Sequence, residues 1–225
     1  MMPDVTYFSD PALAPVRHLQ RAGQWDLALS LLGDKNADLR AEIVTERFMW
    51  QLVPVDFADI DAASPELAKL LTAQISYWHK LFELEGGPEN VDEAAVFAAA
   101  PGGWAAFWHA VVQDNVHKNE ELARAEYARA HELEPNNRFL ESYVVRHQGF
   151  HLLEIDRPKA LALMRRSLQL RAALGARPQL AAAQQVLAQF LPEDDPEAIE
   201  LRQIVAETAE ELKIAWLRVD ATKED

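Results

Sequence analysis

The sequence predicts a single all-α domain built from helical hairpins, and three observations support this class. Helix start and stop signals recur at short intervals and mark roughly ten helices. No run of alternating polar and β-branched residues, the pattern typical of a strand, interrupts them. The chain has 225 residues and is 49% hydrophobic, which is enough apolar material for the core of one domain covering residues 1–225.

The N-terminal part is predicted to contain two short helices and one longer helix. Gly23 and Gly33 end the short helices, because glycine enters the left-handed conformation at a helix C-terminus without steric cost. Asn36 is expected to cap a helix that runs to Val53, the residue before a proline. A loop is expected from there to Ala63.

The clearest amphipathic helix begins at Ser64 and Pro65, an N-cap followed by a residue preferred in the first helical turn. Its apolar residues recur at helical spacing: Leu67, Leu70, Leu71, Ile75, Trp78, Leu81 and Phe82. Asn90 and Glu93 are expected to form a capping box for a short helix that ends at Ala100.

The second half of the chain is predicted to consist of longer helices joined by short connections. The expected helices run from Trp104 to His117, Glu120 to Glu134, Arg138 to Glu154, Arg157 to Leu174, Pro178 to Phe190 and Pro196 to Arg218. The last of these carries a single apolar stripe and is expected to cap the core.

Small and aromatic residues recur at similar offsets in two successive helix pairs, which predicts a repeat. The first set is Phe107, Ala110, Ala123, Tyr127, Ala130 and Pro135, and the second is Val144, Gly149, Ala160, Met164 and Ser167. The alanines at 123 and 160 are 37 residues apart in the sequence, close to a 34-residue period. A weaker match covers residues 23–32.

This pattern resembles tetratricopeptide repeats (TPRs), and the stretch from Ser142 to Ala188 resembles the TPR segments of actinobacterial regulatory proteins. The resemblance covers residues 104–188, whereas residues 37–100 are helical in pattern but align with no repeat. It implies a right-handed α-solenoid in a bacterial protein.

The resemblance also implies a non-catalytic scaffold that receives a peptide or protein segment in a groove lined by the first helix of each pair. The expected groove residues are Trp104, Trp108, His109, Gln113, Arg146 and His151. The TPR subtype that clamps a C-terminal carboxylate is excluded, because Trp108 and Val112 stand where it has polar groups. A partner with basic residues would be attracted by the acidic chain.

A second interpretation is a small-molecule- or metal-dependent helical protein. Its ligand set would be His109, His117, His147, His151 and Glu154, drawn from two adjacent helices. The last three have i, i+4 and i+7 spacing, which places them within about 60° of arc on one helix face. Histidines hydrogen-bonded at helix contacts explain the same pattern, and no motif typical of a metalloenzyme is present.

Composition excludes several other classes. The net charge of -14 opposes binding to a nucleic acid backbone. No apolar stretch approaches the roughly 20 residues of a membrane span, and the N-terminus lacks the pattern of a secretory signal, so a cytoplasmic location is expected. There is no cysteine, no phosphate-binding glycine loop and no nucleophile elbow. We therefore predict no cofactor and favour a binding protein over an enzyme, and the sequence leaves homo-oligomers open.

Overall fold

The computed structural model describes residues 10–217, and within that range the chain is entirely helical, with twelve helices and no strand. The prediction of an all-α protein is confirmed. The helices are α1 (Ala14–Arg21), α2 (Trp25–Leu32), α3 (Ala37–Gln51), α4 (Phe57–Asp61), α5 (Pro65–Leu81), α6 (Glu93–Ala99), α7 (Gly103–Asn115), α8 (Glu120–Leu133), α9 (Arg138–Phe150), α10 (Arg157–Ala173), α11 (Arg177–Phe190) and α12 (Pro196–Leu212). None of these helices is both long enough and apolar enough to cross a bilayer.

Local capping chemistry explains most of the helix ends in the first third of the chain. Gly23 and Gly33 have φ values of 76° and 58°, as the stop signals predicted. The Asn36 side chain accepts a hydrogen bond from the amide of Leu39 at 2.9 Å. The loop predicted to reach Ala63 is wrong in part, because it contains the short helix α4.

The predicted capping box before α6 is also wrong. Asp92, rather than Asn90, caps the helix, and its Oδ1 accepts a hydrogen bond from the amide of Ala95 at 2.9 Å. Asn90 has a φ of 57° and lies in the preceding turn, while Glu93 is the first helical residue. Two acceptors of the same capping class lie two residues apart here, and the turn geometry selects the second.

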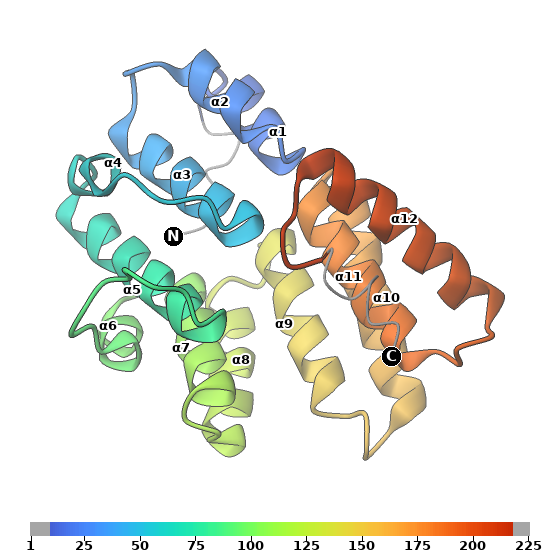
Figure 1. Cartoon of the computed structure of the whole chain (residues 1–225). Helices are drawn as coiled ribbons and strands as arrows, with labels where there is room; N and C mark the ends of the chain where they lie inside the picture. The colour runs from blue at the N-terminus through green and yellow to red at the C-terminus, as the bar shows by residue number, and fades with distance from the viewer. Residues whose placement is uncertain (1–9, 218–225) are drawn as a thin grey trace.

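The second half of the molecule consists of helix pairs that pack side by side: α7 with α8, α9 with α10, and α11 with α12 (Figure 1). The residues of the predicted repeat lie inside these pairs. Ala123, Tyr127 and Ala160 are completely buried, and burial of a large side chain contributes about 1.5–3 kcal/mol. A Cβ on Gly149 would lie 3.1 Å from the carbonyl oxygen of Ala160, so only the smallest residues permit this approach between α9 and α10.

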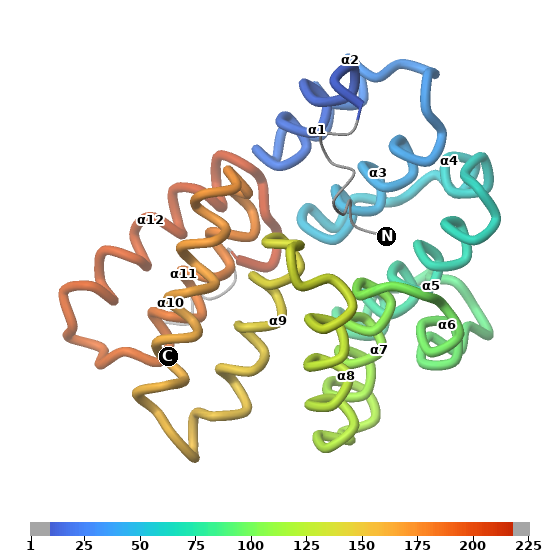
Figure 2. Tube along the Cα trace, turned by 180° about the vertical axis from the view of Figure 1, so that it is seen from behind, coloured from blue at the N-terminus to red at the C-terminus, as the bar shows by residue number. Residues whose placement is uncertain are grey.

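The helices follow one another around an arc that brings the first and last hairpins together (Figures 1 and 2). The turn at Gly23, between α1 and α2, packs against the Leu212 side chain at the end of α12, 3.0 Å from where a glycine Cβ would lie. The Gln51 side chain donates a hydrogen bond to the Leu212 carbonyl at 2.9 Å. The N-terminal arm of the arc, formed by α1 to α5, therefore meets the C-terminal arm, formed by α9 to α12. The concave side of the arc becomes an interior.

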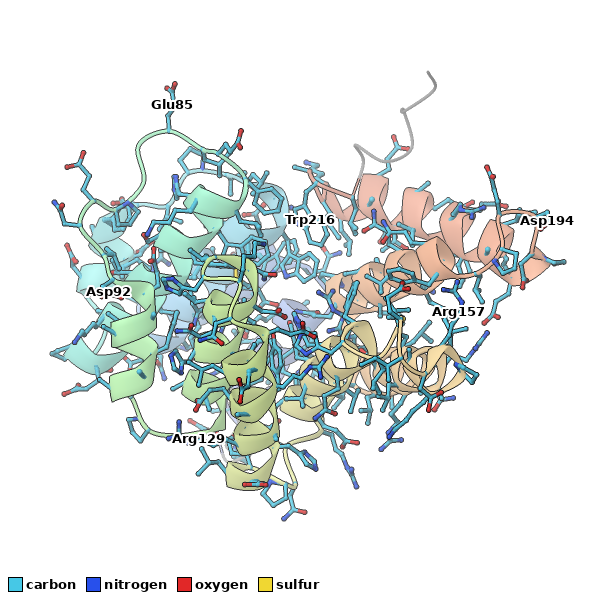
Figure 3. All side chains as sticks on the ribbon, turned by 90° about the horizontal axis from the view of Figure 1, so that it is seen from below. Glu85, Asp92, Arg129, Arg157, Asp194 and Trp216 are labelled. Atoms are coloured by element: carbon cyan, nitrogen blue, oxygen red, sulfur yellow. The ribbon has the colours of Figure 1, made fainter. Side chains whose placement is uncertain are left out.

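The last helix is shorter than predicted, and the segment that follows it forms part of this interior. α12 ends at Leu212, and Arg218, its predicted end, lies outside the described residues. Lys213 takes a φ of 55°, and the chain then turns back across the N-terminal arm. The Ala215 amide donates to the carbonyl of Trp50 at 3.1 Å, and the Trp216 indole donates to that of Met49 at 3.0 Å. Figure 3 shows Trp216 between the N-terminal helices and those of the C-terminal half.

Candidate functional site

A cavity of about 400 Å³ lies where the two arms and the segment after α12 meet. Its volume falls within the roughly 300–1,000 Å³ typical of small-molecule sites. Its lining residues are Met49, Trp50, Tyr77, Trp78, Leu81, Phe82, Trp104, Phe107, Trp108, Val111, Asn115, Tyr143, Arg146, His147, Arg171, Ala182, Val186 and Trp216. Aromatic and aliphatic side chains dominate this set, and no carboxylate belongs to it.

The helical repeat places one stripe of α7 against the cavity. Trp104, Trp108, Val111 and Asn115 follow one another at intervals of four, three and four residues, so their side chains project from the same face. Ala110, on another face of α7, belongs with the α8 residues in the main core cluster. α7 therefore joins the repeat packing to the cavity wall.

The aromatic wall continues across the two arms. The Trp50 and Trp216 rings stack with centroids 5.2 Å apart, and Trp78 stacks on Phe82 at the same distance. Because Trp216 comes from the end of the chain and Trp50 from α3, their contact closes one side of the cavity. Such parallel rings suit a flat apolar group.

Two arginines, the buried Arg171 and the half-buried Arg146, give the cavity a positive end. The Arg171 side chain is 1% exposed and its guanidinium lies 4.6 Å from the centre of the Tyr143 ring. Its Nη1 donates to the carbonyl of Gln179 at 2.6 Å, whereas Nε and Nη2 contact no hydrogen-bond partner within residues 10–217. Arg146 Nε is likewise buried and unpartnered over that range. Burial, together with the charge of Arg146, lowers the pKa of Arg171 to about 9.

The remaining polar groups of the lining are neutral donors or neutral rings. Burial raises the pKa values of Tyr77 and Tyr143 to about 12, so both phenols keep their protons at neutral pH. The indole nitrogens of Trp50, Trp78, Trp104 and Trp108 are buried without an acceptor among the described residues. The cavity thus presents several N–H donors and two guanidinium groups around an apolar space.

A second, more polar pocket of about 730 Å³ lies beside the cavity, along α7, α8 and α9. It shares three lining residues with the cavity, namely Asn115, Arg146 and His147. Arg146 therefore stands at the boundary between the apolar interior and an outer polar pocket.

Three of the six groove residues expected from the sequence line the cavity: Trp104, Trp108 and Arg146. The two tryptophans are also core residues, 1% and 5% exposed, so they serve packing and the cavity wall together. The other three are engaged within the protein. Gln113 Nε2 donates to His109 Nε2 at 3.1 Å, and His151 Nε2 lies 3.0 Å from Asp114 Oδ2.

The five residues of the alternative metal set are not arranged as one ligand set. His109 lies 3.3 Å from the Glu126 carboxylate, and His147 Nδ1 is 2.9 Å from the Tyr127 hydroxyl. His117 is exposed. Across the described part of the chain, no group of three or more histidine, aspartate or glutamate side chains is positioned to hold a metal ion.

The end of α9 explains part of this difference. α9 stops at Phe150, so His151 is its C-cap and Glu154 lies exposed in the following turn. The i, i+7 relation expected between His147 and Glu154 therefore does not hold. Burial and the neighbouring charge of Arg146 move the pKa of His147 well below its ordinary value, which keeps the ring neutral.

Sequence reasoning missed most of the cavity wall, including Trp50, Tyr77, Arg171 and Trp216. The burial of Arg171 could have been predicted from its spacing in the sequence. It continues the buried stripe of Ala160, Met164 and Ser167 at a spacing of four residues after the last of them. An arginine on such a stripe must be buried together with its charge.

Comparison of the chain with protein-family models, with curated protein sequences and with solved structures gives no match. The geometry of the cavity is therefore the basis on which a function can be assigned.

Proposed function

We propose that this chain is a non-catalytic binding protein, built from TPR-like hairpins, whose ligand is a small, mainly apolar molecule held in the central cavity. The observation that carries the proposal is an aromatic space of about 400 Å³ with unpartnered donors in its wall. Binding sites of this kind combine apolar lining with a few placed polar groups.

The chemistry of the lining favours binding over catalysis. Acid–base catalysis at neutral pH needs a group whose pKa lies near the working pH. The lining tyrosines keep their protons, and His147 is neutral with its Nδ1 bound to Tyr127. The residues of the cavity wall provide a ligand with an aromatic surface and hydrogen-bond donors.

A peptide or protein segment carrying basic residues is the second candidate ligand. The outer pocket along α7 to α9 offers it a polar surface, in which Asp114, Glu120 and Glu154 lie beside Lys118, Arg124 and Arg146. The attraction of a basic partner would come from the net charge of -14 of the whole chain. The small molecule is favoured because the cavity is lined from both arms, while His109, Gln113 and His151 are occupied by contacts within the protein.

Cavity filling tests the proposal. Ala182 lies on α11, is 2% exposed and lines the cavity, so Ala182→Phe should reduce the space available to a ligand. Calorimetric titration with neutral 2-naphthylmethanol should show binding to the native chain and at least about tenfold weaker binding to the variant.

The matched control is Ala172→Phe, which adds the same ring at an exposed position on α10 and should bind as the native chain does. Circular dichroism and a denaturation curve establish that both variants are folded. Equal affinity in a folded Ala182→Phe variant would place the ligand outside the cavity.

A further inference from the structure

We propose that the natural ligand of the cavity is an organic acid, with a flat apolar body and one carboxylate bound between Arg146 and Arg171. This inference rests on the proposed function and specifies its ligand class. It follows from the contrast between the charge of the cavity and the charge of the whole protein.

The chain contains 36 acidic and 22 basic residues, so carboxylates are available almost everywhere on it. Nine arginines, among them Arg166 and Arg177, form ion pairs with glutamate or aspartate. Among the described residues, no ion pair includes Arg146 or Arg171, although Arg171 is buried and the Nε of the half-buried Arg146 is buried as well. Arg171, at 1% exposure, thus carries a buried guanidinium with no carboxylate beside it in the described part of the chain.

A buried guanidinium without a counterion is unfavourable, because transfer of a charge out of water is compensated only by pairing and hydrogen bonding. Burial lowers the pKa values of both arginines, and the charge of Arg146 lowers the pKa of Arg171 further. An anion between them would remove the repulsion and supply the acceptors.

The unpartnered atoms of Arg171 define how the anion would bind. Nη1 is occupied by the Gln179 carbonyl, so the free donors are Nε and Nη2, which form the opposite edge of the guanidinium. Two parallel N–H groups on one edge match the two oxygens of a carboxylate. Arg146, on α9, lines the same cavity and would contact the same head group.

The rest of the cavity fits the body of the ligand. Trp50 stacks on Trp216 and Trp78 stacks on Phe82 in its wall, and the two arginines are the charged residues of the lining. Arg146 also borders the outer polar pocket. A ligand that enters from that pocket would meet Arg146 before its apolar body reaches the tryptophans.

Calorimetric titration with two matched pairs of probes tests this assignment. The aromatic pair is 2-naphthoate and 2-naphthylmethanol, and the aliphatic pair is octanoate and 1-octanol. The acid should bind about 30-fold more tightly than the alcohol of the same pair, because loss of one partner of a buried charge pair costs at least about 2 kcal/mol. A flat body predicts that naphthoate binds more tightly than octanoate.

Arg146→Met and Arg171→Met should each abolish most of the preference for acid over alcohol while retaining the alcohol affinity. Arg165→Met is the control, because Arg165 lies on the same helix as Arg171, pairs with Glu197 and does not line the cavity. Inorganic phosphate and acetate should compete only weakly, since they lack the apolar body.

The outcomes separate this inference from the proposed function. Equal binding of acid and alcohol overturns the acid assignment and leaves an apolar binding cavity. Failure of all four probes to bind at millimolar concentration overturns both. Retention of the acid preference in both arginine variants places the anion elsewhere, and competition by phosphate as strong as by naphthoate rejects the apolar body.

Discussion

The Tyr127 contact between α8 and α9 and the arginine end of the cavity differ in how their buried polar atoms are hydrogen-bonded. Between α8 and α9, the hydroxyl of Tyr127 lies 2.9 Å from His147 and 3.3 Å from Asp114, so a completely buried polar atom has partners inside the protein. At the centre of the arc, Nε and Nη2 of Arg171 and Nε of Arg146 are buried donors without a partner among the described residues.

Glu46 is another buried polar group that has its hydrogen-bond partners inside the protein. Its carboxylate is buried between the arms and accepts hydrogen bonds from Gln20 at 2.6 Å and Gln179 at 2.8 Å. Gln179 also accepts the hydrogen bond from Arg171 through its backbone, so one residue stands between a buried acid and a buried base. Gln179 thus separates the Glu46 carboxylate from the Arg171 guanidinium.

The difference indicates which buried polar groups are structural. Buried polar groups in folded proteins are usually hydrogen-bonded, and local departures from this rule concentrate at functional sites. The Tyr127 hydroxyl follows the rule, whereas Arg171 and the indoles of the cavity wall do not. The following experiments test whether that division is real.

The largest expected effect is the pH dependence caused by Glu46, whose pKa burial raises to about 7. A carboxyl group whose pKa is raised by folding stabilises the folded state fully at pH values below 4.5, its ordinary pKa. This stabilisation is lost as the pH rises to 7. The free energy of unfolding should fall by about 2–3 kcal/mol between pH 4.5 and 7 from this group.

Urea denaturation at pH 5 and pH 8 measures this change, and Glu46→Gln should remove most of it. The Glu46 carboxylate is hydrogen-bonded by Gln20 on α1 and by Gln179 on α11. The nearby charged groups are Arg17 and Arg21, both on α1. Glu66→Gln, an exposed position on α5, is the control and should leave the pH dependence intact. The same loss of stability in Glu46→Gln would assign the effect to other groups.

Overpacking of a helix pair should give the next largest effect. Ala160 is completely buried where α9 approaches α10, so Ala160→Leu should lower the free energy of unfolding by about 1–3 kcal/mol. Ala162→Leu adds the same side chain to the exposed face of α10 and should be nearly neutral. Equal urea midpoints for the two variants would show that the repeat alignment at this position is incorrect.

Removal of one hydroxyl from the satisfied network should cost less. Tyr127→Phe leaves His147 Nδ1 buried without its partner and should lower the free energy of unfolding by about 1–2 kcal/mol. Tyr77→Phe is the comparison, because the Tyr77 hydroxyl binds the exposed Asn115 side chain, which can bond to water instead. A larger loss in the Tyr77 variant than in the Tyr127 variant would contradict this order.

The smallest expected change is that of Arg171→Met, which should raise rather than lower the free energy of unfolding. Replacement of a buried, unpaired charge by an apolar side chain of similar volume is often neutral or stabilising. Arg171→Met should therefore leave the ligand-free protein unchanged or up to about 1 kcal/mol more stable. A loss above about 2 kcal/mol in thermal or urea unfolding would show that Arg171 is retained for structure rather than for a ligand.

The sequence predicted those parts of the molecule that depend on neighbouring residues. Asn36, Gly23 and Gly33 fix helix ends through local backbone geometry, and the small residues at 123, 149 and 160 lie in the helix pairs as their spacing indicated. It failed where two local solutions were close in energy, as with Asn90 and Asp92 before α6, and where α9 ends before Glu154.

The all-helical class and the pairing of α7 with α8 and of α9 with α10 were therefore determined by the sequence alone, because capping and apolar periodicity act over a few residues. The cavity was decided only by the tertiary structure. Arg146 and Arg171 come from the paired helices α9 and α10, whereas Trp50 and Trp216 come from α3 and from the segment after α12. The tryptophans meet the arginine-bearing helices because the arc closes where Gln51 contacts Leu212. Their shared environment comes from that long-range closure, so no local pattern contains it.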